Sequence, residues 1–158
     1  MNPRVVTACV VVFAIGTVMM ARGAEPALTP EEQKAEALVR EAVELIKAKG
    51  EAAFPEFRVK GSKWLSEGHF IFVADDKGLE LVNGASTDLE GKNLWDHQDP
   101  TGRYVVREEV ALVKAKGSGW YDCLWPKPGE TEAVPCHSFI HEVTLNDRLL
   151  VVGTPIFK

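Results

Sequence analysis

The sequence has little cysteine, more acidic than basic residues, and no catalytic signature. Three cysteines in 158 residues are too few for a small fold held together by several disulfides. Its 18 Lys and Arg against 23 Asp and Glu give a net charge of −5. This balance argues against nucleic acid as a partner, because binding phosphates needs a basic face. A G-x-S-x-G elbow and a glycine-rich nucleotide loop are both missing, so we predict no catalytic residue and no enzyme.

An apolar run lies near the N-terminus. It covers residues 5–20, follows the basic Arg4, and is followed by the small residues of 21–24. This layout is typical of a secretory signal peptide, and the run is shorter than the roughly 20 residues of a membrane span. We therefore expect residues 1–24 to be a signal peptide and residues 25–158 to form one domain in the periplasm or outside the cell. The alternative is an uncleaved membrane anchor.

Apolar periodicity in residues 25–158 predicts helices followed by strands. A long helix is expected between the Thr29 cap and the Gly50 stop. Shorter helices are expected at 51–54, limited by Pro55, and at 103–116. The expected strands are 69–74, 79–82, 120–125, 136–144 and 149–157, with a loop over 83–99. Short-turn strands with segregated helices indicate the α+β class and one antiparallel sheet of about five strands.

Cys123 and Cys136 remain after the signal peptide is removed, and they flank a turn between two predicted strands. If they face each other, Tyr121 faces Ser138 on the same side of the hairpin. Opposed Cβ atoms lie roughly 4.5–5.5 Å apart, near disulfide reach. An exported protein with an even cysteine pair is expected to oxidise it, so we predict a structural disulfide that leaves ligand affinity unchanged. The alternative is a redox or metal-binding pair.

The remaining metal and haem patterns do not fit. His137 and His141 are four residues apart in a predicted strand, which separates them by about 13 Å along the strand. Covalent haem needs C-x-x-C-H, but the position three before Cys136 is Ala133. Residues 96–102 do not match a calcium loop. We expect no metal and no cofactor.

Several motifs occur in a fixed order along residues 25–158. They are Leu89-Glu90-Gly91-Lys92-Asn93-Leu94, Gly117-Ser118-Gly119-Trp120 and Leu124-Trp125-Pro126-Lys127-Pro128. Together they resemble the single Cache domain family, the PAS-like extracellular sensor modules of bacterial receptors. The resemblance implies a long N-terminal helix packed on a five- to six-stranded antiparallel sheet. It also implies a pocket between the sheet and the segment at about 83–113.

The resemblance implies a ligand-binding or sensory module that binds a small organic acid without catalysis. Arg103 and Arg107 could grip a carboxylate, and Trp120 and Tyr121 could wall the pocket. The alternative is that these residues have no role in binding, with both arginines in solvent and Trp120 in the core. Because neither a second membrane span nor a signalling domain follows the Cache-like part, we expect a free-standing exported protein.

The sequence also departs from the family at two polar positions. Cys123 stands where the family usually has Tyr, and Cys136 stands near a usual Lys. These departures support a second interpretation, an accessory protein that uses the PAS-like domain for contact with a protein partner in the envelope. A membrane contact is expected only if the N-terminal segment is uncleaved.

Overall fold

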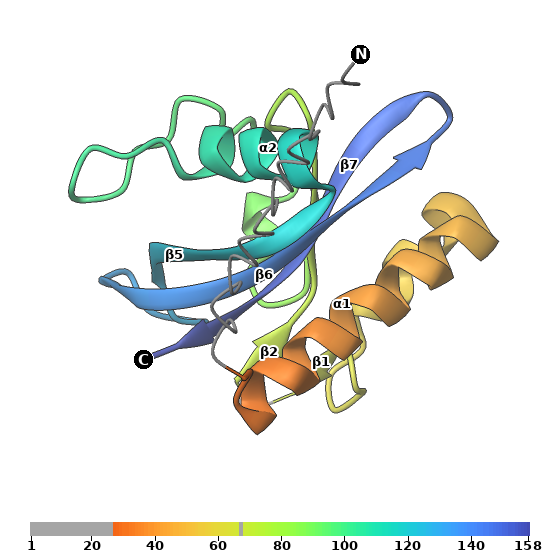
Figure 1. The fold of residues 1–158 in the computed structure, drawn as a ribbon, viewed down its shortest axis with the longest axis horizontal. Coiled ribbons are helices and arrows are strands. Elements are labelled where there is room, and N and C mark those ends of the chain that lie inside the picture. The colour runs from red at the N-terminus through yellow and green to blue at the C-terminus, as the bar shows by residue number, and fades with distance from the viewer. Residues whose placement is uncertain (1–26, 67) are drawn as a thin grey trace, which may run out of the picture.

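A five-stranded antiparallel sheet forms the centre of the protein, with its strands in the order β4-β3-β7-β6-β5 (Figure 1). The computed structural model describes residues 27–66 and 68–158, so the predicted signal peptide lies outside the described residues. The elements are α1 (Pro30–Lys49), η1 (Gly50–Arg58), β1 (Leu65–Ser66), β2 (His69–Phe70), β3 (Phe72–Asp75), β4 (Glu80–Asn83), η2 (Thr87–Leu89), α2 (Val105–Lys116), β5 (Ser118–Pro126), β6 (Ala133–Leu145) and β7 (Arg148–Phe157). The predicted α+β class is confirmed. No helix in the described part of the chain is both long and apolar enough to cross a membrane.

Helix α1 begins and ends where the sequence predicts. The Thr29 hydroxyl accepts a hydrogen bond from the Glu32 backbone N–H, and the Glu32 carboxylate accepts one from the Thr29 N–H, which completes a capping box. Gly50 ends the helix with a φ of 61°, a backbone conformation that glycine adopts without a steric penalty. The predicted apolar stripe is buried, and it consists of Ala35, Leu38, Val39, Ala42, Val43 and Ile46.

The chain between α1 and β3 differs from the prediction. The short helix is a 3₁₀ helix, η1, and Pro55 lies inside it instead of limiting it. It continues because Ala53, Phe54 and Phe57 bury their side chains in the core, and this packing outweighs the local cost of proline. The strand predicted at 69–74 is divided, because β2 pairs with β1 in a separate two-stranded sheet while β3 pairs with β4 and β7.

Strands β5 and β6 pair in the predicted register. Cys123 faces Cys136 across β5 and β6, and Tyr121 faces Ser138. On its other edge β6 pairs with β7 over ten residues, from Cys136 facing Phe157 to Leu145 facing Arg148. Alternate side chains therefore point to opposite faces of the sheet along all three strands.

The two faces of the sheet carry different partners. Helix α1 covers one face, where its stripe packs with Val73, Phe139 and Val152. Helix α2 lies on the opposite side (Figure 1), where Val106, Val110 and Val113 pack against Ile140 and Val151. The α2 side is the less completely filled of the two, and it holds the candidate site.

Gly153 in β7 provides a test of this packing. A Cβ atom at Gly153 would lie 2.4 Å from Cζ of Phe72 and 2.8 Å from Cγ2 of Ile140. Gly153→Ala is therefore expected to lower the free energy of unfolding by about 1–3 kcal/mol, as overpacked cores do. Gly119→Ala is the matched control, because its nearest neighbour is a flexible Leu112 methyl group at 3.3 Å. Equal urea midpoints for both variants would contradict this packing.

Candidate ligand pocket

A pocket with an empty volume of about 440 Å³, partly open to solvent, lies between the sheet and α2. It is lined by Phe70, Phe72, Glu80, Asn83, Leu94, Val105, Val106, Glu109, Tyr121, Cys123, Trp125, Cys136, Ser138 and Pro155. These residues come from β2, β3, β4, α2 and the three long strands, together with the loop that precedes α2. This is the place between the sheet and segment 83–113 that the family resemblance implies.

The largest part of the wall is aromatic and apolar. Phe70 and Phe72 come from the β2–β3 segment, and Tyr121 and Trp125 come from alternate positions of β5. The loop residue Leu94 is also buried beside the pocket. Such a wall, broken by a few polar groups, is the usual construction of a small-molecule site.

Glu109 of α2 is the first polar group of the pocket. Its side chain is buried, and the Tyr121 hydroxyl donates a hydrogen bond to its Oε1. Burial raises the pKa of Glu109 to about 7, although the Tyr121 hydrogen bond acts in the opposite direction. Burial also raises the pKa of Tyr121 well above its ordinary value, and the Glu109 charge adds to this shift. Tyr121 is therefore a neutral hydrogen-bond donor at physiological pH.

Glu80 of β4 is the second buried carboxyl group. Nδ2 of Asn83 donates a hydrogen bond to its Oε1 at 2.9 Å. Asn83 is itself held in place, because its Oδ1 accepts from the Ser86 N–H at 2.8 Å. Burial raises the pKa of Glu80 to about 8, and the charges of Glu109 and Glu90 raise it further against the effect of Asn83. At neutral pH the pocket thus contains carboxyl groups that hold protons for much of the time.

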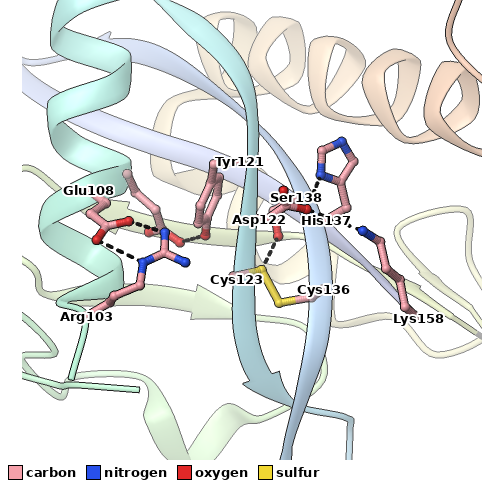
Figure 2. The surroundings of a disulfide bond; sticks show 10 residues. Arg103, Glu108, Tyr121, Asp122, Cys123, Cys136, His137, Ser138 and Lys158 are labelled. Carbon is pink, nitrogen blue, oxygen red and sulfur yellow. Dashed lines mark hydrogen bonds and ion pairs between the residues drawn. A yellow bond between two sulfur atoms is a disulfide. The ribbon is translucent and has the colours of Figure 1, made fainter. Parts of the chain in front are cut away.

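The predicted disulfide joins Cys123 of β5 to Cys136 of β6 (Figure 2). Both cysteine side chains line the pocket, and the Oγ of Ser138 lies 3.2 Å from the Sγ of Cys123. The register that joins the cysteines also turns them toward α2 together with Tyr121. The expectation that replacing the cysteines leaves ligand affinity unchanged stays a prediction.

Arg103 and Arg107 are held by acidic and carbonyl partners near the start of α2. Arg103 forms an ion pair with Glu108 (Figure 2). Arg107 donates from Nε to the Trp95 carbonyl at 2.9 Å, pairs with Asp96, and lies over the Tyr104 ring at 3.8 Å. Neither arginine is among the residues that line the pocket in the described part of the chain. Their contact with a ligand stays a prediction.

Trp120 and Tyr121 lie on opposite faces of the sheet, as neighbours in a strand must. Tyr121 lines the pocket, whereas Trp120 lies on the α1 side of the sheet. There its ring packs against Phe139, with ring centroids 5.2 Å apart, and stacks on His137, with ring centroids 4.7 Å apart. A ligand contact from Trp120 also stays a prediction. Of the four predicted ligand-binding residues, the structure therefore places one, Tyr121, in the pocket lining, where it lies with the two cysteines.

Glu80, Asn83, Glu109 and Ser138 were not identified from the sequence. A signal existed for Glu109, because this acidic residue shares the apolar helical face of Val105, Val106 and Val113. Ser138 could have been found from the hairpin register, since it faces Tyr121. Glu80 and Asn83 carry no comparable signal, because only the packing of the β3–β4 hairpin buries them.

The histidines of β6 have local partners. Nδ1 of His137 lies 3.0 Å from Oδ1 of Asp122, and Nδ1 of His141 lies 2.6 Å from the Glu142 carbonyl oxygen. Across residues 27–66 and 68–158, no group of three or more His, Cys, Asp or Glu side chains is arranged to hold a metal ion.

The disulfide is expected to stabilise the domain. Its cysteines are 13 residues apart, and closing a loop of this size in the unfolded chain is worth about 3 kcal/mol. The double variant Cys123→Ser/Cys136→Ser should lose about that much, and the reduced natural protein should unfold at the same urea concentration as the variant. Non-reducing alkylation with mass spectrometry checks the bond, and two alkylated thiols in protein taken from the periplasm would contradict it.

The buried carboxyl groups are expected to make stability fall as pH rises from about 4.5 to about 8. In the unfolded chain Glu80 and Glu109 ionise near 4.5, whereas the folded state holds their protons to pKa values of about 8 and 7. The folded state therefore binds more protons in this window, which lowers stability by up to about 1.4 kcal/mol per pH unit for each group. Glu80→Gln should remove its part of this slope in urea titrations at pH 5 and pH 8. The exposed Glu130→Gln should leave the slope unchanged, and a Glu80→Gln slope equal to that of the natural protein would overturn this expectation.

Comparison with known proteins places this fold and pocket in a family. A family model described as a Cache domain matches residues 58–156. The sensor histidine kinase MctS of Rhizobium johnstonii is 34% identical over 91 residues, which cover 58% of this chain and 19% of the kinase. The chain thus matches about a fifth of that relative's length.

Two solved structures share the fold. One, a periplasmic sensor domain of a chemotaxis protein, is 28% identical with a TM-score of 0.71, over 80% of this chain and 94% of that chain. The other, described as the structural basis for carboxylic acid recognition by a Cache chemosensory domain, is 24% identical with a TM-score of 0.67, over 80% of this chain and 92% of that chain. The family model and the shared fold confirm the resemblance noted in the sequence: this chain belongs to the Cache domain family.

Proposed function

We propose that this chain is an extracytoplasmic sensory module that binds a small organic molecule in the pocket between α2 and the sheet, without converting it. The observation that carries the proposal is the preformed pocket itself, in which carboxyl, hydroxyl and amide groups from different elements converge within an aromatic wall. The volume of about 440 Å³ includes open solvent, and the cavity proper is about 40 Å³, so the ligand must be small or must displace side chains of the wall.

The absence of chemistry is part of the proposal. Glu109 and Tyr121 form a hydrogen-bonded pair, and the two cysteine sulfurs of the pocket are joined to each other, so neither is a free thiol. The Ser138 hydroxyl lies 3.2 Å from Cys123 Sγ, and the described lining contains no His to act as its base. In this pocket a ligand would be held by hydrogen bonds and apolar contact, and its release would leave the protein unchanged.

A small organic acid is the ligand class that the family resemblance implies. A carboxylate would need hydrogen-bond donors here, because the described lining contains no Lys, Arg or His. The donors would be the Tyr121 hydroxyl, the Asn83 amide and the protonated forms of Glu80 and Glu109. Such binding would weaken as pH rises through about 7 to 8, since the two glutamates would then lose the protons they donate. An organic acid as ligand stays a prediction.

A signalling role would need a partner. MctS is a sensor histidine kinase, and its length extends far beyond the matched part. We propose that ligand occupancy in this chain is read by a second protein in the cell envelope, or by a further part of the same protein.

The accessory-protein interpretation is the second candidate. This interpretation predicts a pocket that is filled by the protein's own side chains and an exposed apolar patch that binds the protein partner. The pocket is partly open to solvent, and among the described residues the exposed large hydrophobic side chain is Val59, which lies alone. Ligand binding is therefore the function that the geometry supports better.

Thermal unfolding with a library of small acids, amines and neutral polar compounds tests ligand binding. A ligand at 100 times its Kd should stabilise the protein by about 2.7 kcal/mol, a shift of several degrees in Tm for a domain of this size. Tyr121→Phe should reduce the shift because it removes a hydroxyl from the pocket wall. Tyr104→Phe changes the other tyrosine, which lies outside the lining, and should keep the shift. No shift with any compound would contradict the proposed function.

A further inference from the structure

The charge of the pocket lining has one sign. Among the described lining residues the ionisable side chains are Glu80, Glu109 and Tyr121, and none of them carries positive charge. Cys136 also lines the pocket, and its sulfur is bound in the disulfide.

Three arginines of the neighbouring segments have acidic partners. Arg58 donates from Nε to Glu90 Oε1 at 2.8 Å and from Nη2 to Glu90 Oε2 at 2.8 Å. Arg103 pairs with Glu108, and Arg107 pairs with Asp96. The ring centroids of His97 and Trp125 are 5.1 Å apart, and His97 is not a lining residue. These three arginines therefore balance acids other than the two lining carboxyl groups.

Each lining carboxyl group has a protein donor on one oxygen. Oε1 of Glu80 accepts from Asn83, and Oε1 of Glu109 accepts from Tyr121. The two residues are only 4% and 6% exposed, yet both side chains line the pocket. A ligand that donates N–H groups into the pocket could therefore reach both carboxyl groups.

The wall of the pocket suits the same kind of ligand. Phe70, Phe72, Tyr121 and Trp125 present aromatic surface to the space beside the two carboxyl groups. Aromatic faces attract ammonium groups through the negative potential above the ring, most strongly when water is excluded. Two carboxyl groups from facing elements and an aromatic wall are together a binding surface for positive charge.

We propose that the ligand is a small organic cation, a protonated or alkylated amine, whose ammonium group lies between Glu80 and Glu109 and whose carbon skeleton contacts the aromatic wall. This inference rests on the proposed function and names its ligand class. The class differs from the organic acid that the family resemblance implies.

Electrostatics decide between the two classes. A carboxylate would add a third acidic group to a pocket that contains two, and both glutamates would have to keep their protons. An ammonium group instead allows one glutamate to ionise, which leaves a neutral ion pair in the pocket. The pKa of Glu109 is already about 7, so its ionisation at neutral pH costs little, and a cation within about 4–6 Å lowers that pKa further. A cation therefore binds with release of a proton, and an anion binds without it.

Calorimetric titration with matched compounds tests the proposal. The probes are butylammonium and tetramethylammonium, with butyrate and 1-butanol as comparisons of similar size. We expect binding by at least one of the two ammonium ions and no binding by the comparisons. Affinity should rise about tenfold from pH 6 to pH 8, because the ionised fraction of a group with a pKa of about 7 rises from about one tenth to nine tenths.

Three variants locate the cation. Glu109→Gln should weaken ammonium binding at least tenfold and reduce its pH dependence to the part that Glu80 contributes, and Glu80→Gln should also weaken binding. Glu130→Gln is the control, because Glu130 is exposed and lies outside the lining. Its affinity should equal that of the natural protein. Circular dichroism at each pH confirms that the variants are folded.

The possible outcomes separate this inference from the proposed function. Binding of butyrate but of neither ammonium ion, with affinity that falls from pH 6 to pH 8, would overturn the cation and leave a small-molecule sensor. Equal binding of all four compounds, or ammonium binding that Glu109→Gln does not change, would also overturn it. Failure of the whole library of the preceding subsection would instead overturn the proposed function.

Discussion

The pairing of β6 with β5 on one edge and β7 on the other is the constraint on which the rest of the structure depends. In this register Cys123 lies opposite Cys136, and Tyr121 lies opposite Ser138. Because side chains alternate along a strand, this one register sends Phe139 and its alternates to α1 and sends the pocket residues to α2. A slip of one residue would exchange the two faces, and neither the helix stripe nor the pocket could then form.

Two kinds of buried carboxyl group show how stability and function divide in this fold. Burial alone would raise the pKa of Asp75, but hydrogen bonds from Arg148 and from the backbone N–H groups of Leu79 and Lys77 outweigh burial and lower it. Asp75 thus fastens the β3–β4 turn to β7. Glu80 and Glu109 have one donor each, and burial dominates their pKa values. Strongly raised carboxyl pKa values of this kind cluster at functional sites.

The disulfide belongs to both roles. It links the two strands that form the pocket wall, and its sulfur atoms are part of that wall. The polar character of the pocket comes from Glu80, Glu109, Asn83 and the hydroxyl groups of Tyr121 and Ser138. The backbone fold that carries these groups is shared with the chemotaxis sensor domain.

The sequence by itself determined the long helix with its Thr29 cap, the α+β class, the antiparallel hairpins and the register that pairs Cys123 with Cys136. These features are local, because periodicity, capping residues and turn residues specify them within a few positions. Tertiary structure alone decided that Pro55 lies inside a helix, that the strand at 69–74 is divided, and that Glu80 and Glu109 share one buried space. The burial of Glu80 and Glu109 results from packing of β4 near α2, two segments that are far apart in the chain. The sequence contains no pattern that predicts which side chains come together there.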